Sequence, residues 1–162
     1  TDFRVALKVL GAFSDGDLSQ QEKAEVLLRL LYPAPPINPL KAVKQGMKWL
    51  NLGVEAELSD EPPIYDFEKD GKYIYTAFQS SYNIDLESVD YLHWWKFRAL
   101  FSDLGECFFS HLVGIRSRMR TGELMEHERK FVAKNIDIIE LEEAGESAAD
   151  EFLKMWGDNE NG

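Results

Sequence analysis

Apolar side chains recur at every third or fourth position along most of the chain, which is the spacing that places them on one face of an α-helix. Alternation with a period of two never runs far, so no strands are expected. The helices that this pattern predicts run over about residues 1–13, 19–32, 39–50, 66–82, 86–102, 107–119, 122–135 and 147–156. We therefore predict an all-α fold, a compact bundle of about six to seven helices around a central aromatic helix.

Local sequence motifs predict several helix ends. Ser19-Gln20-Gln21-Glu22 is a capping box, in which the Ser and Glu side chains satisfy each other's backbone donors. Asn38-Pro39 is a cap followed by proline at the first helical position. Residues 54–65 are acidic and contain a proline pair, and we interpret them as the longest loop of the core. Gly71 would then lie inside the helix predicted over 66–82, at a cost of about 1 kcal/mol relative to Ala.

The segment predicted as the central helix is apolar nearly all round, which is typical of a helix buried on most sides. Its apolar groups form two stripes at about 100° per residue. One stripe holds Trp94, Phe97 and Phe101, and the other holds Leu92, Trp95 and Ala99 with Tyr91 beside it. Either both stripes are buried or one of them contacts a partner. Our hypothesis is that at least one apolar stripe of residues 91–101 is exposed.

The chain has 162 residues, of which 44% are hydrophobic and 12% aromatic, enough to build a core of its own. The net charge of −11 is concentrated at the end, since residues 135–162 hold nine acidic groups and one lysine. We therefore predict a helical core domain over 1–134 and an acidic C-terminal tail with a short helix over 135–162. This balance argues against binding to nucleic acid, which needs clustered Lys and Arg. The basic cluster at 116–120 is interpreted as a solvated helix end.

Location follows from what the sequence lacks. A single cysteine, Cys107, cannot form an intramolecular disulfide, so the fold does not depend on an oxidising compartment. No run of 18 apolar residues exists, and the first residues do not form a signal peptide. The chain lacks an initiator Met, so it is either processed or a fragment. We predict a cytoplasmic protein without membrane contact.

Motifs for catalysis or metal binding are incomplete. Residues 66–71 are similar to the first half of a calcium loop, but the twelfth position, which should be a bidentate Glu, is Ala77. The three histidines, His93, His111 and His127, lie in three different predicted helices, and none belongs to a zincin motif. There is no phosphate-binding Gly-rich loop and no nucleophile elbow. We predict that the protein is not an enzyme and needs no cofactor or metal.

Four stretches resemble one known family, and the resemblance as a whole covers about residues 1–134. They are Asp2-Phe3-Arg4, Asp66-Phe67-Glu68-Lys69-Asp70, Tyr73-Ile74-Tyr75-Thr76-Ala77-Phe78 and Tyr91-Leu92-His93-Trp94-Trp95-Lys96-Phe97-Arg98-Ala99-Leu100-Phe101. The family is the bacteriophage gene-product-fifteen family of long-tailed phages and prophages, and the double-Trp segment is the most specific part. Two departures are present: the short segment that usually precedes Asp-Phe-Arg is absent, and residues 135–162 match no part of the pattern.

The resemblance implies a role in phage tail assembly. Members of the family are typically encoded between the major tail protein and the tape-measure protein, where tail-assembly chaperones are found. The expected partners are therefore the tape-measure protein and the major tail protein, and self-association stays open. A structural minor tail or connector component of the virion is the alternative. The residues expected to bind a partner are Tyr91, Trp94, Trp95, Phe97, Arg98 and Phe101.

Overall fold

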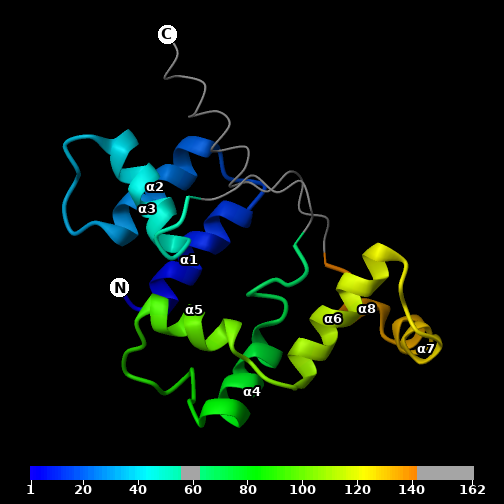
Figure 1. Ribbon diagram of the computed structural model, residues 1–162. Coiled ribbons are helices and arrows are strands. Elements are labelled where there is room, and N and C mark those ends of the chain that lie inside the picture. Colours follow the sequence, from blue (N-terminus) through cyan, green and yellow to red (C-terminus); the bar gives the residue numbers. More distant parts are fainter. Residues whose placement is uncertain (56–62, 142–162) are drawn as a thin grey trace. The chain divides into compact units, whose positions relative to one another are not determined.

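Helices form the whole regular structure of residues 1–55 and 63–141, which are the residues that the computed structural model describes (Figure 1). Within these residues there is no strand, and one isolated bridge joins Asp2 and His93. The helices are α1 (Phe3–Ser14), α2 (Gln20–Leu31), α3 (Pro39–Leu50), α4 (Gly71–Tyr82), α5 (Trp94–Ser102), α6 (Phe108–Thr121), α7 (Glu126–Lys134) and α8 (Ile136–Ile139). The predicted all-α fold is confirmed, while the helix predicted over 147–156 lies outside the described residues. None of the described helices is long and apolar enough to cross a membrane.

Helices α2 and α3 begin where the local sequence predicts, and α1 begins slightly later. Ser19 and Glu22 form the capping box of α2, with the Ser19 N–H donating to the Glu22 carboxylate at 2.8 Å. The Asn38 side chain accepts from the Lys41 N–H at 3.0 Å and caps α3, which has proline in its first turn. Helix α1 begins at Phe3, two residues after the predicted start, because its cap is Asp2, whose carboxylate accepts from the Arg4 N–H.

The helix predicted from Asp66 begins five residues later than expected. The Asp66 carboxylate accepts from the N–H groups of Glu68 and Lys69 at 2.8 and 2.7 Å, which holds the chain in a turn. Helix α4 then starts at Gly71, with Asp70 as its cap residue. Gly71 therefore lies at the first helical position, and the predicted cost of a glycine in the helix interior does not apply.

The helix predicted over 86–102 is also shorter, because residues 92–94 pair with the beginning of the chain. The Phe3 N–H donates to the Leu92 carbonyl at 2.8 Å, and the Trp94 N–H donates to the Thr1 carbonyl at 3.1 Å. The Asp2 carboxylate accepts from the Leu92 N–H at 3.0 Å. Because these backbone groups are hydrogen-bonded to residues 1–3, they do not form bonds of a longer helix, and α5 begins only at Trp94.

The helix predicted over 122–135 starts four residues later, at Glu126, and a short further helix follows it. Helix α6 ends at Thr121 and is capped by Gly122, whose φ of 74° places it in the left-handed region that suits a C-terminal cap. Helix α7 begins at Glu126, after a short turn, and ends at Lys134. Helix α8 follows directly, so residues 136–139 are helical. Since 142–162 lie outside the described residues, the division into a core and a tail stays a prediction.

The described chain forms two compact units. The first contains residues 1–55 and 91–98, and the second contains residues 63–90 and 99–141. Helix α5 is shared, with its first five residues in the first unit and its last four in the second. The first unit has the larger apolar core, made of Phe3, Ala6, Val9, Phe13, Ala24, Leu27, Ala42, Val43, Met47, Leu50, Leu92, Trp94 and Phe97. A Cβ on Gly46 would lie 2.7 Å from the Leu27 side chain, so this glycine permits the close approach of α2 and α3.

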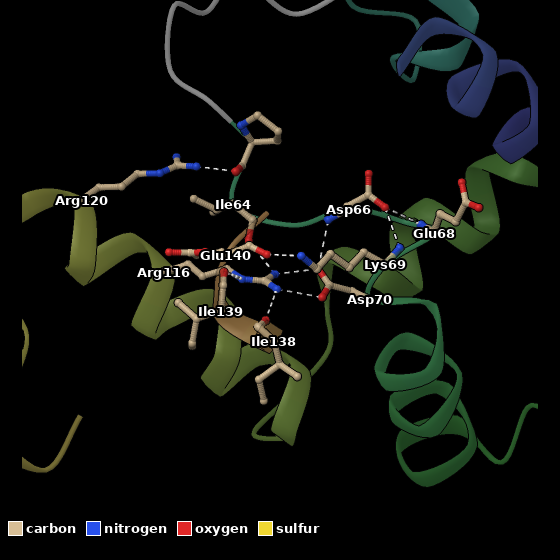
Figure 2. Close-up of polar contacts among 11 residues, drawn as sticks. Ile64, Asp66, Glu68, Lys69, Asp70, Arg116, Arg120, Ile138, Ile139 and Glu140 are labelled. Carbon is tan, nitrogen blue, oxygen red and sulfur yellow. Dashed lines mark hydrogen bonds and ion pairs between the residues drawn. The ribbon is translucent and has the colours of Figure 1, made fainter. Parts of the chain in front are cut away.

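The second unit is organised around a buried arginine, Arg116 of α6 (Figure 2). Its guanidinium forms a bidentate pair with the Asp70 carboxylate, at 2.6 Å from Nη1 to Oδ2 and 2.9 Å from Nη2 to Oδ1. It also donates to the carbonyls of Ile64, Ile138 and Ile139, at 3.3, 2.6 and 2.9 Å. All five N–H donors of the guanidinium are thereby used, and α6 is joined to three other segments.

Two further arginines of α6 have internal partners. Arg118 binds the buried Glu128 of α7, with Nε at 3.0 and 3.1 Å from the two carboxylate oxygens. This bond to Arg118 is the chief reason why the pKa of Glu128 is lowered to about 2. Arg120 donates to the Pro63 carbonyl, and Figure 2 shows this contact beside the Arg116 network. The basic cluster interpreted as a solvated helix end is therefore largely used inside the second unit.

Candidate protein-binding site

The two tryptophans of the predicted binding segment have opposite exposures. Trp94 is fully buried at 0% exposed, whereas the neighbouring Trp95 is 42% exposed. Adjacent residues on a helix point about 100° apart, so the packing of one side chain leaves the other at the surface. Tyr91, just before α5, is 57% exposed. The hypothesis was that at least one apolar stripe of residues 91–101 is exposed. In the second stripe, Tyr91 and Trp95 are exposed, whereas Leu92 is buried at 4%.

Trp94 and Phe97 belong to the core of the first unit. Phe97 is 1% exposed, and its ring stacks on Phe3 with centroids 4.8 Å apart. The Trp94 ring also stacks on Phe97, with centroids 5.7 Å apart. These two side chains anchor the binding segment to the core, and neither reaches the surface of the folded unit. Whether any of the six residues binds a partner stays a prediction.

Both indole N–H groups donate to the end of α3. The Nε1 of Trp94 lies 2.9 Å from the Leu50 carbonyl, and the Nε1 of Trp95 lies 2.9 Å from the Trp49 carbonyl. The last carbonyls of a helix have no partner within the helix and need donors from elsewhere. The two tryptophans supply these donors, and this fixes the start of α5 against the end of α3.

The exposed ring of Trp95 is held in one orientation. Beside its hydrogen bond to Trp49, it lies over Gly53, where an added Cβ would meet the ring at 3.5 Å. Gly53 has a φ of 84°, which suits the left-handed turn that ends α3. Val54, directly after this turn, is also exposed. An apolar ring that is half in water and yet fixed is suited to binding another apolar surface.

Arg98 and Phe101 occupy different surroundings. The Arg98 guanidinium lies over the Trp94 ring, 5.5 Å from its centroid, and its buried Nε has no hydrogen-bond partner in the described part of the chain. Phe101 is half-buried in the second unit, where it joins an aromatic cluster with Tyr65, Phe67 and Phe109. The stripe predicted to hold Trp94, Phe97 and Phe101 together is thus divided between the two units.

The His93 side chain caps the N-terminus of α5. Its Nδ1 accepts from the Trp95 N–H at 3.2 Å, and its carbonyl accepts from the Phe97 N–H at 2.9 Å. Its ring meets Trp49 edge-on, with centroids 6.1 Å apart. An acceptor role for Nδ1 requires the proton of a neutral ring to be on Nε2. His93 therefore has a packing and capping role.

The residues that suggested other chemistry have internal roles. Asp66 and Asp70, from the partial calcium loop, bind backbone N–H groups and Arg116. Cys107 caps α6, with its Sγ 3.4 Å from the Ser110 N–H. Within residues 1–55 and 63–141, no group of three or more His, Cys, Asp or Glu could hold a metal ion.

Sequence reasoning missed the Arg116–Asp70 pair and the Arg118–Glu128 pair. The arginines are two residues apart in a cluster that looks like a solvated helix end, and their partners lie 46 and 10 residues away. The only available signal for the first pair was that the acidic residues at 66–70 and the basic cluster at 116–120 have opposite charges. Charge alone cannot select one partner among 29 carboxylates.

Comparison with known proteins identifies the family. The family model described as Bacteriophage Gp15 protein matches residues 1–141, so the similarity continues through α8, beyond the 134 residues expected. No curated protein and no solved structure matches the chain. The matched range contains both units and the double-Trp segment that suggested the resemblance. The chain therefore belongs to the Bacteriophage Gp15 protein family and is a phage structural or morphogenesis protein.

Proposed function

We propose that this protein is a tail-assembly chaperone of the host cytoplasm that binds the tape-measure protein and the tail-tube subunits. It acts by binding, without catalysis, cofactor or metal. The observation that carries the proposal is the exposed but fixed ring of Trp95 at the end of α3, with Tyr91 exposed four residues earlier. Membership of the phage family supports it, because assembly of a tail requires proteins that handle its components.

A fixed aromatic side chain is an efficient anchor for an apolar helical client. Tryptophan and tyrosine dominate binding energies at protein interfaces, because they bury a large area with few rotatable bonds. Trp95 has already lost part of its rotational freedom through its bond to the Trp49 carbonyl. Binding therefore costs less conformational entropy than it would at a mobile side chain.

The net charge of −11 supports the same role. A chaperone bound to a long, partly apolar chain has to keep the complex in solution. Net charge far from zero opposes association of such complexes with one another. A fixed apolar anchor on a charged protein combines both requirements.

Co-expression with the tape-measure protein of the same phage tests the proposal. We expect the tape-measure protein to become soluble and to co-purify with this protein. Trp95→Ala should weaken the complex by about 2 kcal/mol, or about thirtyfold, because a tryptophan anchor is lost. Phe108→Ala is the matched control, since Phe108 is 46% exposed and lies in the other unit. Its effect should be small.

Three results would contradict the proposal. The tape-measure protein would stay insoluble, the two substitutions would weaken the complex equally, or the protein would be found in stoichiometric amounts in purified virions. The last result would favour a structural minor tail or connector role instead. Circular dichroism of each variant separates lost binding from lost folding.

A further inference from the structure

An open pocket in the first unit lies between the end of α2 and the second half of α3. It has a volume of about 320 Å³ and is lined by Thr1, Leu31, Tyr32, Gln45, Gly46 and Trp49. Thr1 and Gln45 are exposed, so the pocket opens at the surface. Sites for whole small molecules have volumes of about 300–1,000 Å³, and this pocket is at the lower limit of that range. It has room for one or two large side chains of a partner.

Contacts within the unit hold the walls of the pocket in place. The Tyr32 hydroxyl donates to the Ala42 carbonyl at 2.7 Å, which fixes its ring against α3. The Trp49 ring meets His93 edge-on, with centroids 6.1 Å apart. Trp49 also joins the pocket to the exposed aromatic anchor, because its carbonyl accepts the Trp95 indole N–H at 2.9 Å. A pocket with fixed walls binds a side chain at a lower entropic cost than a mobile surface does.

The charged side chains that flank the pocket along α3 are positive. Lys41 lies four residues before Gln45 and Lys48 three residues after it, so the three side chains lie within about 60° of one another around the helix. Lys41 and Lys48 are exposed, and no acidic residue occurs in the sequence from 37 to 54. Lys48 has a weak, exposed contact with Glu55, its Nζ lying 3.5 Å from Oε1. A positive charge therefore lies one helical turn to either side of the pocket.

The first unit as a whole has the same sign of charge, although the complete chain has a net charge of −11. Its described residues, 1–55 and 91–98, hold nine basic and six acidic side chains, a net charge of +3. Complementary charge steers a partner towards a surface and suppresses partners of the wrong sign. A segment that binds in this pocket is therefore expected to carry carboxylates.

The spacing of the two lysines fits a helical partner. Lys41 and Lys48 are seven residues apart, which is about 10 Å along the axis of α3. A second helix lying along α3 advances at the same rate, so carboxylates one turn before and one turn after a central apolar residue face both lysines. In an extended strand, the two nearest residues that flank a central one on the same face are about 14 Å apart, which does not match.

We propose that this pocket receives one large apolar side chain of an amphipathic client helix, and that Lys41 and Lys48 pair with acidic residues one turn to either side of it. The client is then selected by an apolar residue between carboxylates, and not by hydrophobicity alone. That the helix belongs to the tape-measure protein rests on the proposed function, whereas the preference of the pocket does not.

Synthetic helical peptides test this preference on the full chain without the client. All are alanine-rich and about 20 residues long. The acidic peptide has a central leucine with glutamate four residues before and three residues after it; the basic peptide has lysine at these two positions. In ¹H–¹⁵N spectra, the acidic peptide should shift the Trp49 indole signal and bind about tenfold more tightly than the basic one. Replacing its leucine with alanine should weaken it about tenfold.

Substitutions in the protein give the matched comparisons. Gln45→Trp places a large ring at the mouth of the pocket and should weaken binding of the acidic peptide about tenfold. Gln21→Trp makes the same change at an exposed position of α2 and should leave binding unchanged. Lys41→Glu/Lys48→Glu should reverse the order of the two peptides, so that the basic one binds more tightly. Circular dichroism checks that each variant is folded.

Three results would refute the binding mode. The acidic and basic peptides would bind equally, Gln45→Trp would have no effect, or the shifted signals would lie away from Trp49. Co-expression with the tape-measure protein separates the pocket from the chaperone role. A client that becomes soluble equally well with Gln45→Trp would overturn the pocket and leave the chaperone role intact. Peptides that bind as expected, beside a client that stays insoluble, would support the pocket and contradict the chaperone role.

Discussion

The two units satisfy the carbonyls at their helix ends with different donors. In the first unit, the indoles of Trp94 and Trp95 donate to Leu50 and Trp49 at the end of α3. In the second unit, the guanidinium of Arg116 donates to Ile138 and Ile139 of α8. An indole is neutral and brings its own apolar surface, whereas a buried guanidinium needs a counter-charge, here Asp70. The first unit therefore depends on packing, and the second on completed ion pairs.

This difference predicts which changes each unit tolerates. Loss of volume should damage the first unit most, because its core is a continuous apolar cluster around Trp94 and Phe97. Loss of one charge should damage the second unit most, because the remaining partner stays buried without compensation. Hydrogen exchange can assign each effect to its unit, and urea denaturation measures its size.

The largest effect is expected for Trp94→Ala. This substitution removes a fully buried ring and the donor to the Leu50 carbonyl, so we expect a loss of about 4–5 kcal/mol in the free energy of unfolding. Extra hydrogen exchange should appear first in α1 and α3. Trp95→Ala is the control and should cost less than half as much, because its ring is 42% exposed. Equal costs would show that the burial of Trp94 is not what stabilises this unit.

Arg116→Met should lower the free energy of unfolding by about 3–4 kcal/mol. Asp70 would remain 1% exposed with its charge uncompensated, and three carbonyls would lose their donor. Adding Asp70→Leu to this variant should recover part of the loss, because the unpaired charge is removed as well. Urea denaturation of both variants checks this. Asp70→Leu alone is measured as well. If the losses of the two single variants simply add in the double variant, charge pairing is not the main contribution.

Acid should destabilise both units through named carboxylates. The pKa of Glu128 is lowered to about 2, chiefly by Arg118, from an ordinary value of 4.5. The pKa of Asp2 is lowered to about 2, chiefly by its side-chain bond to Arg4, from 3.8. Below these ordinary values the unfolded chain binds more protons than the folded chain does. The stability contributed by each pair is therefore present above about pH 4.5 and is lost as the pH falls towards 2.

Variants assign this pH dependence to the units. Glu128→Gln should reduce the fall of the unfolding free energy between pH 4.5 and 2, as should Asp2→Asn. The measurement is urea denaturation at several pH values. A pH dependence that neither substitution changes would mean that other carboxylates control acid unfolding.

The smallest effect is expected at the C-terminal cap of α6. Gly122→Ala should lower the free energy of unfolding by about 1 kcal/mol. The reason is the backbone, because an L-residue is strained at a φ of 74°, whereas no atom lies within 4 Å of the new Cβ. Gly11→Ala is the matched control with the opposite sign. Gly11 lies inside α1 with equal space around it, so alanine there should stabilise by up to about 1 kcal/mol. Thermal denaturation of both variants is sufficient, and a destabilised Gly11→Ala would contradict the backbone explanation.

Local signals predicted the helix ends correctly only where their partners are local. The capping box of Ser19 and Glu22 and the cap at Asn38 are satisfied within four residues, and both are present. The predicted starts of α4 and α5 were wrong for different reasons. The Asp66 carboxylate holds the N–H groups of Glu68 and Lys69 in a local turn, which the helical pattern does not reveal, whereas the Leu92 N–H donates to Asp2, 90 residues away. A helical pattern shows that a residue can be helical, but it cannot show that its backbone is needed elsewhere.

The candidate site shows the same limit. The sequence indicated an aromatic segment at 91–101 with two apolar stripes, and it left open which stripe is buried. The stacking of Phe97 on Phe3 and the bond from Trp94 to Leu50 turn one stripe inward and leave Trp95 at the surface. Phe101 joins a separate aromatic cluster of the second unit.

The sequence by itself determined the all-α class, most helix segments and the family, since each depends on the order and spacing of nearby residues. Only the tertiary structure decided which tryptophan is exposed and which carboxylate pairs with Arg116. Those outcomes depend on which distant groups compete for the same buried space and the same donors. Burial makes an unmatched polar group costly, so the folded state selects one set of partners from the many that the sequence allows.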